Sequence, residues 1–573
     1  MRTFRRFARF EAAPLDLAAC AVLCVVSVIA LFTFRDYGLG WDDYSHSQYG
    51  EMLYSYYLSG FTDLRAFHFV NLHYYGGGFD IAATLLGKVL PFNMFDTRRL
   101  LGAVVGILGM VVVWRTARRL GSAGFGSAES GGTESGPLAG LAALLLIATA
   151  APYYGHMFVN AKDTPFAVAM IFLIYSLVRA FDEYPKPRAS TILIFALALG
   201  LTIGTRVIGL IAVAFAGIAF LFLIAGEWRQ QGLRPALTRA VGFCGWLALA
   251  LPLAYIVMGL IWPWSVRAPL NPINALEYFS HFWEKPWREM YDGVPTPILD
   301  MPRTYLPKLC FLKFPEIFIG LGLAGAAGAT VASLRGGLSP QRRAQLMLVV
   351  SAAVLPILLA VATKPVLYNG MRHFLFVSPA FAVLGGLAAA YSYGLLKQYR
   401  FGLATSAAAI FIALIGWTTV DLARIHPYQY ALFNHAAGGM QRASQRYMTD
   451  YWGLGFKEVA SQMIERLGRE HWPEDRKWRV AVCGPPTSAT IELGPHFVAS
   501  IDATGADFAI SLGTFYCAQL DAPVLAEAGR EGVVFARAYD LRGRHYVTTW
   551  VPEPPITTDI ASAGHKANTF WHE

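Results

Sequence analysis

Long apolar runs, bounded by Arg and Lys, recur along most of the chain. A helix needs about 20 apolar residues to cross the hydrocarbon core of a membrane, so each run predicts a transmembrane helix. The runs lie at about residues 15–34, 99–116, 137–152, 164–180, 190–205, 207–226, 240–261, 315–334, 344–363, 373–395 and 401–421. The pattern therefore predicts a mainly α, polytopic membrane protein with about eleven transmembrane helices.

The charged residues between the runs predict how these helices are oriented. Arg2, Arg5, Arg6 and Arg9 precede the first run, and no small-residue cleavage pattern follows it. We therefore expect a retained first helix and a cytoplasmic N-terminus. Every second loop from that start carries Arg or Lys, in agreement with the positive-inside rule. An odd number of helices then places the chain after about His426 outside, which in a bacterial inner membrane is the periplasm.

Composition supports a membrane protein and argues against a nucleic-acid-binding protein. Of the 573 residues, 55% are hydrophobic and only 15% are charged, and the mean hydropathy is +0.42. Soluble domains rarely have such values. The formal net charge of +9 comes from cations spread over short loops, whereas nucleic-acid binding needs one basic patch.

The composition changes after Arg424. A small α/β domain is predicted there by an amphipathic helix followed by short apolar segments at 477–483, 496–502, 507–512, 532–540 and 545–551. We expect a transmembrane domain over residues 1–428 and a periplasmic α/β domain over 429–573. A disulfide between Cys483 and Cys517 is permitted in that compartment, but their spacing leaves open whether they pair.

The unusual polar residues are concentrated in the loops predicted to lie outside. In the first of these, WDDYSHSQYG, His46 lies one helical turn beyond Asp42 and close to Asp43. A carboxylate here can take the proton of an attacking hydroxyl, so we predict Asp42 as a general base, Asp43 as a second catalytic acid and His46 as a substrate contact. The alternative is a helix N-cap, for which Asp is favoured, although a cap needs only one acid.

The second outside loop, YYGHMFVNAKDTP, places His156, Asn160, Lys162 and Asp163 close together. Lys162 is a point charge that can hold a phosphate. We predict Asp163 as a further catalytic acid, which can steer an acceptor or, together with Asp42, bind a divalent cation. We predict that His156 and Asn160 contact the substrate. The alternative for Asp163 is a structural acid in the first turn of a helix, where a carboxylate is favoured electrostatically.

Two arginines lie at the outer ends of apolar runs, where an unpaired charge is costly. Arg206 interrupts GLTIGTRVIGL, and Arg372 lies in YNGMRH beside His373. We predict that Arg206, Arg372 and His373 bind a lipid-linked phosphate, and that Tyr368 contacts the substrate. The alternative is that both arginines merely extend to the membrane interface.

A long outside loop from Trp262 to Lys313 contains eight prolines and many aromatic residues. A loop of this length is usually functional or disordered. A mobile lid over a sugar site is one interpretation, and an aromatic belt at the membrane interface is the other.

Together these motifs resemble bacterial family 39 glycosyltransferases. The resemblance rests on the acid pair after the first run, NAKDTP, YNGMRH and HPYQYALFN, and it covers roughly residues 15–455. These are GT-C enzymes related to protein O-mannosyltransferases and to the aminoarabinose transferase that modifies lipid A. The resemblance implies a polyprenyl-phosphate sugar as donor and Asp42 as the catalytic acid residue. The family often has Asp-Glu at this point, so Asp43 departs from its pattern.

Chemistry also favours a lipid-linked donor, because nucleotide sugars are made in the cytosol and do not cross bilayers. The leaving group would be a lipid phosphate, whose growing negative charge Lys162, Arg206 and Arg372 would stabilise. Direct attack by an acceptor oxygen activated by Asp42 would invert the anomeric centre. We therefore predict a glycosyltransferase whose acceptor is lipid A or lipopolysaccharide, another glycan or a protein.

A non-enzymatic transporter or lipid flippase is the alternative function. A transporter is expected to show internal repeats and charges at mid-depth in several helices. The sequence shows neither, because its charges gather at one face.

Overall fold

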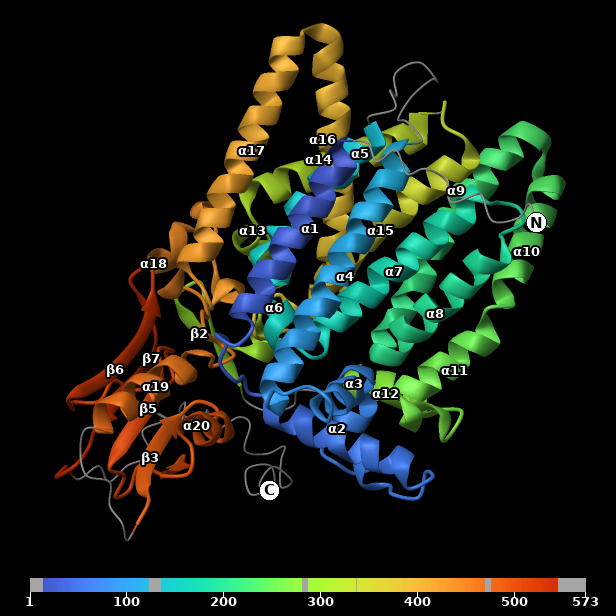
Figure 1. The fold of residues 1–573 in the computed structure, drawn as a ribbon. Helices are drawn as coiled ribbons and strands as arrows, with labels where there is room; N and C mark the ends of the chain where they lie inside the picture. The colour runs from blue at the N-terminus through green and yellow to red at the C-terminus, as the bar shows by residue number, and fades with distance from the viewer. Residues whose placement is uncertain (1–13, 123–134, 281–286, 336, 469–475, 545–573) are drawn as a thin grey trace, which may run out of the picture.

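The computed structural model describes residues 14–122, 135–280, 287–335, 337–468 and 476–544, and it is 69% helical. The helices form a bundle, and a small sheet domain lies against one end of it (Figure 1). The predicted fold class, a mainly α polytopic membrane protein with a small C-terminal α/β domain, is confirmed.

Nine helical segments in the described ranges are long and apolar enough to cross a membrane. They are α1 (Pro14–Thr33), α4 (Met94–Ser122), α7 (Asp163–Asp182), η3 with α9 (Val207–Gln231), α10 with α11 (Leu233–Ile261), α14 (Glu316–Arg335), α15 (Pro340–Thr363), α16 (Val377–Tyr399) and α17 (Phe401–Arg424).

The two remaining predicted runs are also helical but depart from a straight span. One is the run at 137–152, which matches α5 (Ser135–Ala148). After a short break and a bend of 62°, the chain continues as α6 (Ala151–Val159), most of which was predicted as part of the second outside loop. The other is α8 (Ala189–Thr205), which has only 17 residues. Each predicted run therefore corresponds to a helix or a helix pair.

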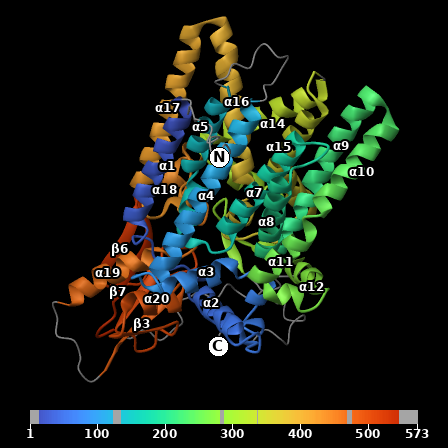
Figure 2. The ribbon, with the colours of Figure 1, turned by 45° about the vertical axis from the view of Figure 1, so that its right-hand side comes forward.

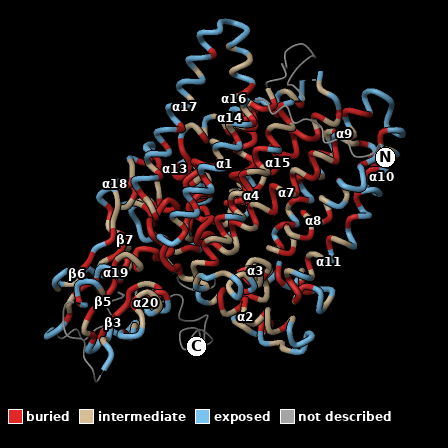
Figure 3. Tube along the Cα trace, viewed as in Figure 1, coloured by how far each residue is buried: buried red, intermediate tan, exposed pale blue. Residues whose placement is uncertain are grey.

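Burial separates central helices from peripheral ones. The apolar window of α7 is 72% buried, whereas that of α17 is only 17% buried. Figure 3 shows the buried residues gathered in the middle of the bundle and exposed residues along α10, α11 and α17. Exposed apolar side chains on these outer helices suit contact with lipid.

Shorter elements cover the end of the bundle beside the sheet domain (Figures 1 and 2). Helix α2 (Asp43–Leu58) packs on α3 (Gly78–Gly87). The long loop from Trp262 to Lys313 is largely structured in its described part. It forms η4 (Pro263–Val266), α12 (Asn271–Ser280), the antiparallel hairpin β1 (Arg288–Tyr291) and β2 (Val294–Pro297), η5 (Ile298–Asp300) and α13 (Tyr305–Lys313).

The sheet domain has five strands in the order β4-β3-β5-β7-β6. Strand β3 pairs in parallel with β4 and β5, while β7 pairs antiparallel with β5 and β6. The elements are α19 (Gly455–Leu467), β3 (Trp478–Cys483), α20 (Pro486–Leu493), β4 (Phe497–Ser500), β5 (Phe508–Leu512), β6 (Val524–Arg530) and β7 (Val533–Asp540).

Four of the predicted strands are present as β3, β4, β5 and β7, and the predicted strand at 545–551 lies outside the described residues. The sequence reading missed β6, whose VLAEAGR segment lacks a run of large apolar residues because it forms the edge of the sheet. Cys483 and Cys517 form a disulfide, which answers the question that the spacing left open.

The segment between α17 and α19 packs with the helices. Tyr430, Tyr451 and Trp452 belong to the core of the bundle, while a separate core begins at Phe456 and fills the sheet domain. This connecting segment includes η7 (Gln429–Ala431), η8 (His435–Ala437) and α18 (Gly439–Ser444).

Candidate active site

Segments far apart in the sequence bring the predicted charged residues to one end of the bundle. Asp42 precedes α2, Lys162 and Asp163 lie at the start of α7, Arg206 follows α8, and Arg372 begins η6 (Arg372–Phe374). This is the end on which α2, α3 and the sheet domain lie (Figure 2).

Asp163 is the buried centre of the cluster, with a side chain that is only 1% exposed. Its carboxylate forms an ion pair with Arg206, and its Oδ2 lies 3.3 Å from Nη1 of Arg372. The Nδ2 of Asn160 donates a further hydrogen bond of 2.7 Å to the same Oδ2. A buried carboxylate is stable only when it is paired and hydrogen-bonded in this way. Asp163 therefore holds the two arginines in place.

Asn160 closes the turn that leads into α7. Its Oδ1 accepts hydrogen bonds from the backbone N–H groups of Lys162 at 3.0 Å and Asp163 at 2.7 Å. Asp163 is the first residue of α7, so it lies in the first helical turn, as the structural alternative requires. The carboxylate of Asp163 itself faces arginines. That Asn160 contacts substrate stays a prediction.

Asp42 has far more open surroundings than Asp163. Its side chain is 39% exposed, and its Oδ2 lies 3.2 Å from Nζ of Lys162. Although it is the residue before α2, its side chain makes no capping hydrogen bond. Burial alone would raise the pKa of Asp42, but the charges of Lys162, Arg372 and His46 have the larger effect and lower the pKa from 3.8 to about 2. Asp42 is therefore an ionised carboxylate that a ligand can reach.

Asp43 contacts the backbone instead. Its Oδ2 accepts a hydrogen bond of 2.7 Å from the N–H of Gly40, which closes the turn before α2. Burial raises the pKa of Asp43, and the charge of Arg99 opposes that shift. A turn-closing role accounts for these contacts, and a catalytic role for Asp43 stays a prediction.

The ring of Tyr75 lies beneath two of the cations. Its centroid is 4.7 Å from Nζ of Lys162 and 5.5 Å from Cζ of Arg206, distances at which cations are attracted to an aromatic face. The next residue, Gly76, approaches α8 so closely that a Cβ would lie 1.6 Å from the carbonyl oxygen of Gly204. The sequence reading did not single out Tyr75, although the neighbouring YYGGG run signals such a close approach.

Arg372 is sandwiched by aromatic side chains. Its Cζ lies 4.7 Å from the ring centroid of Trp452 and 5.2 Å from that of Tyr368. Tyr368 also packs edge to face on His373, with centroids 4.8 Å apart. The structure thus places Tyr368 next to the predicted phosphate-binding residues. Trp452 was missed because it comes from a distant segment whose approach to η6 no sequence pattern signals.

His373 lies among the cations as a neutral ring. Burial, followed by the charge of Arg372, holds the pKa of His373 well below its ordinary value. Its Nδ1 is buried and has no hydrogen-bond partner in the described part of the chain. A neutral imidazole can donate one hydrogen bond to a phosphate but adds no charge.

His46 and His156 each have a buried protein partner. Nδ1 of His46 lies 2.8 Å from Asp80, whose other carboxylate oxygen accepts a 2.6 Å hydrogen bond from Arg98. Nε2 of His156 lies 3.0 Å from the hydroxyl of Tyr451. The sequence reading missed Asp80 and Arg98, and substrate contact by either histidine stays a prediction.

The solved structures that match over most of this chain include membrane glycosyltransferases, the kind of enzyme that the motifs resemble. ArnT from Cupriavidus metallidurans, solved with bound undecaprenyl phosphate, is 17% identical and matches over 91% of this chain and 97% of that chain, with a TM-score of 0.46. The oligosaccharyltransferase of Archaeoglobus fulgidus, solved with a tethered acceptor peptide, is 13% identical over 86% of this chain and 64% of that chain, with a TM-score of 0.44. No protein-family model and no curated protein sequence matches the chain. At these TM-scores the likenesses carry no functional conclusion for this chain.

The residues of the site do not fit a divalent cation. Within the described ranges, no three His, Cys, Asp or Glu side chains form a group that could hold a metal ion. The two acids suggested as ligands, Asp42 and Asp163, are each paired with positive side chains. We therefore derive no step that uses a metal.

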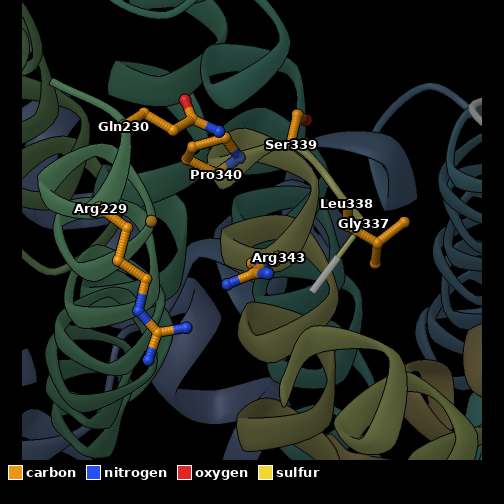
Figure 4. A pocket seen from close by; sticks show the side chains of 8 residues that line it. Arg229, Gln230, Gly337, Leu338, Ser339, Pro340 and Arg343 are labelled. Atoms are coloured by element: carbon orange, nitrogen blue, oxygen red, sulfur yellow. The ribbon is translucent and has the colours of Figure 1, made fainter. Parts of the chain in front are cut away.

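The pocket in Figure 4 lies at the opposite end of the bundle, between the end of α9 and the start of α15. Near the pocket, Gln345 donates a hydrogen bond to the carbonyl of Val178 in the last part of α7. At a rise of 1.5 Å per residue, about 22 Å of α7 separates Val178 from Asp163. The pocket has a volume of about 270 Å³, and no carboxylate is among its lining residues. It therefore lacks a general base.

The cluster around Asp163 suits an anionic ligand next to an accessible base. Lys162, Arg206 and Arg372 supply three positive charges, and Asp42 and Asp163 supply two negative ones, which leaves a net charge of +1. Buried cations in excess favour an additional anion. Of the two acids Asp42 and Asp163, Asp42 is the one whose side chain is open to that ligand.

Proposed function

We propose that this protein is an integral membrane glycosyltransferase that moves a sugar from a polyprenyl-phosphate donor to an acceptor on the periplasmic face, with inversion. The observation that carries the proposal is the pairing of an exposed, ionised Asp42 with Lys162, beside two arginines held by Asp163. Phosphate-binding cations and a general base are the groups that such a transfer needs.

The proposed reaction is a single displacement. The acceptor hydroxyl gives its proton to Asp42 while its oxygen forms a bond to the anomeric carbon of the sugar. The bond between that carbon and the phosphate oxygen breaks at the same time, and the lipid phosphate leaves with the electron pair. Arg372, Arg206 and Lys162 stabilise the charge that grows on the phosphate.

Donor binding is expected to strengthen the base. While Lys162 is bound to Asp42, the pKa of Asp42 is about 2, and so acidic a group is a weak base near neutral pH. A donor phosphate that attracts Lys162 away from Asp42 removes a principal cause of that low pKa. The carboxylate then becomes more basic at the moment when the sugar is in place.

Donor binding by variants of Lys162 and Arg372 tests the proposal. Lys162→Ala and Arg372→Ala should each weaken binding of a synthetic polyprenyl-phosphate sugar and slow its turnover, because both contacts persist as the phosphate departs. Arg372→Lys should rescue only part of the loss, since lysine keeps the charge but not the planar fork. Binding and turnover are measured in nanodiscs, and unchanged donor affinity in both alanine variants would rule out this phosphate site.

The same experiment separates the enzyme from other interpretations of Arg372. An arginine that only anchors η6 at the interface would accept lysine with little loss, and its removal would reduce protein yield more than donor affinity. The sugar and the acceptor can be identified by mass spectrometry of envelope glycolipids and glycoproteins from cells with and without the gene.

A further inference from the structure

A buried glutamate in the long loop before α14 takes no part in the mechanism described above. Glu289 is on strand β1, where alternate residues are buried, and it is only 2% exposed. A buried carboxylate is costly unless donors surround it, so its partners indicate what it does.

Glu289 and Tyr305 together hold two consecutive backbone amides. One carboxylate oxygen of Glu289 accepts a hydrogen bond from the N–H of Asn369, and the other accepts a bond of 2.7 Å from the hydroxyl of Tyr305. The oxygen of that hydroxyl accepts a bond of 3.1 Å from the N–H of Gly370. One Glu–Tyr pair therefore fixes both amides of the Asn-Gly turn.

This turn sets the position of Arg372. Asn369 and Gly370 have φ values of 54° and 70°, in the left-handed region that Asn and Gly adopt most readily. The chain then enters η6, where Arg372 points to Asp163 at 3.3 Å. The side chain of Arg372 is only 6% exposed and has little room to adjust. The position of its guanidinium therefore depends on the backbone direction that the turn sets.

The hairpin that carries Glu289 is itself anchored. Strands β1 and β2 are joined by Asp292 and Gly293, both with positive φ, as a two-residue hairpin turn requires. The carboxylate of Asp292 pairs with Lys308 and Arg446 and accepts a 2.8 Å hydrogen bond from Tyr447. The hairpin is thus tied to the segment before the sheet domain, which makes Glu289 a fixed support.

From these contacts we propose that Glu289 is a positioning residue, which holds the Asn369–Gly370 turn so that Arg372 meets the donor phosphate beside Asp163. The proposal rests on the proposed function, because it assumes that Arg372 binds that phosphate. It also gives the long loop a role other than that of a mobile lid, since its hairpin supports the site from the side.

The test is a double-mutant cycle that measures binding of a fluorescent polyprenyl phosphate to purified protein in nanodiscs. Glu289→Ala should weaken binding by roughly tenfold, because the charge-assisted contact of a misplaced Arg372 is lost. Glu289→Gln should lose less, since one carbonyl oxygen can still accept the N–H of Asn369. In the Arg372→Ala background, Glu289→Ala and Glu289→Gln should have no further effect on affinity.

Glu227 provides a matched control at the opposite end of the bundle. It is also 2% exposed and accepts a 2.7 Å hydrogen bond from a tyrosine, Tyr184. Glu227→Gln should leave the affinity for polyprenyl phosphate unchanged, and thermal unfolding of every variant shows how much stability each change removes.

The outcomes separate this inference from the proposed function. If Arg372→Ala binds polyprenyl phosphate as well as the parent protein, the phosphate site itself is wrong. If Arg372→Ala loses affinity but Glu289→Ala and Glu289→Gln do not, or if their effects add to that of Arg372→Ala, only the positioning role is wrong. Should Glu289→Ala fail to fold, Glu289→Gln and Tyr305→Phe give the same comparison.

Discussion

The starts of α2 and α7 carry the same sequence signal but have different surroundings. Each has an acid at the first helical residue or just before it, at the same end of the bundle. Asp163 is 1% exposed and is bonded to two arginines and an amide, whereas Asp42 is 39% exposed and has one lysine as its partner. A saturated carboxylate can only hold its neighbours, while an open one can take a proton. In the proposed mechanism, this difference gives Asp163 a positioning role and Asp42 the role of base.

The largest effect on turnover is expected from substituting Asp42, the more exposed carboxylate. Asp42→Asn removes the base but keeps the size of the side chain, so turnover should fall by about a hundred- to ten-thousand-fold while the protein still folds. Turnover and thermal unfolding of the purified variant check this. Asp43→Asn is the matched control, and it should reduce turnover less because its carboxylate contacts the backbone of Gly40.

Substitution of Asp163, the buried carboxylate, should mainly reduce the stability of the protein and its affinity for the donor. Asp163→Asn leaves Arg206 and Arg372 buried without their counter-charge, and breaking a buried ion pair costs about 3–5 kcal/mol. The melting temperature should therefore drop clearly below that of Asp42→Asn, and donor affinity should fall with it. A variant as stable and as tight-binding as the parent would show that Asp163 does not hold the arginines.

A smaller effect is expected on the pH dependence of activity, through the pKa of Asp42. The pKa of Asp42 is lowered from 3.8 to about 2 in the folded protein, so its ionised form contributes stability above about pH 4 that is lost as the pH falls toward 2. Lys162→Ala removes a principal cause of that lowering, so the pKa of Asp42 should rise. The acid limb of the kcat/KM profile, which reports the pKa of the free enzyme, should move to higher pH in Lys162→Ala and stay in place in a variant of a distant lysine, Lys397→Ala.

The sequence predicts most of the helices and the residues of the charged cluster, because each depends on a local signal. Apolar runs mark the spans, and Asp42, Lys162, Asp163, Arg206 and Arg372 stand out as charges beside them. The sequence does not predict which of Asp42 and Asp163 remains accessible to a ligand, because accessibility is not a local property. It depends on the arginines that reach Asp163 from other helices.

The supporting residues could not be predicted for the same reason. Glu289 and Trp452 act on Arg372 from segments about 80 residues away on either side, and no spacing rule relates them. Helix α6 was also missed, because the predicted apolar run ends at Pro152 and the polar residues that follow favoured a loop. Such features follow from packing between segments rather than from the pattern within one.

In the proposed mechanism Asp42 activates the acceptor while the cations hold the donor phosphate, and one measurement separates these roles. Purified parent protein and Asp42→Asn, in nanodiscs with membrane acceptor extract, are given the same labelled polyprenyl-phosphate sugar. Donor occupancy and release of polyprenyl phosphate are then followed in the same samples. We expect nearly equal occupancy in both proteins but release that is at least about a hundredfold slower in Asp42→Asn. Release at the parent rate by fully occupied Asp42→Asn would show that Asp42 is not the base.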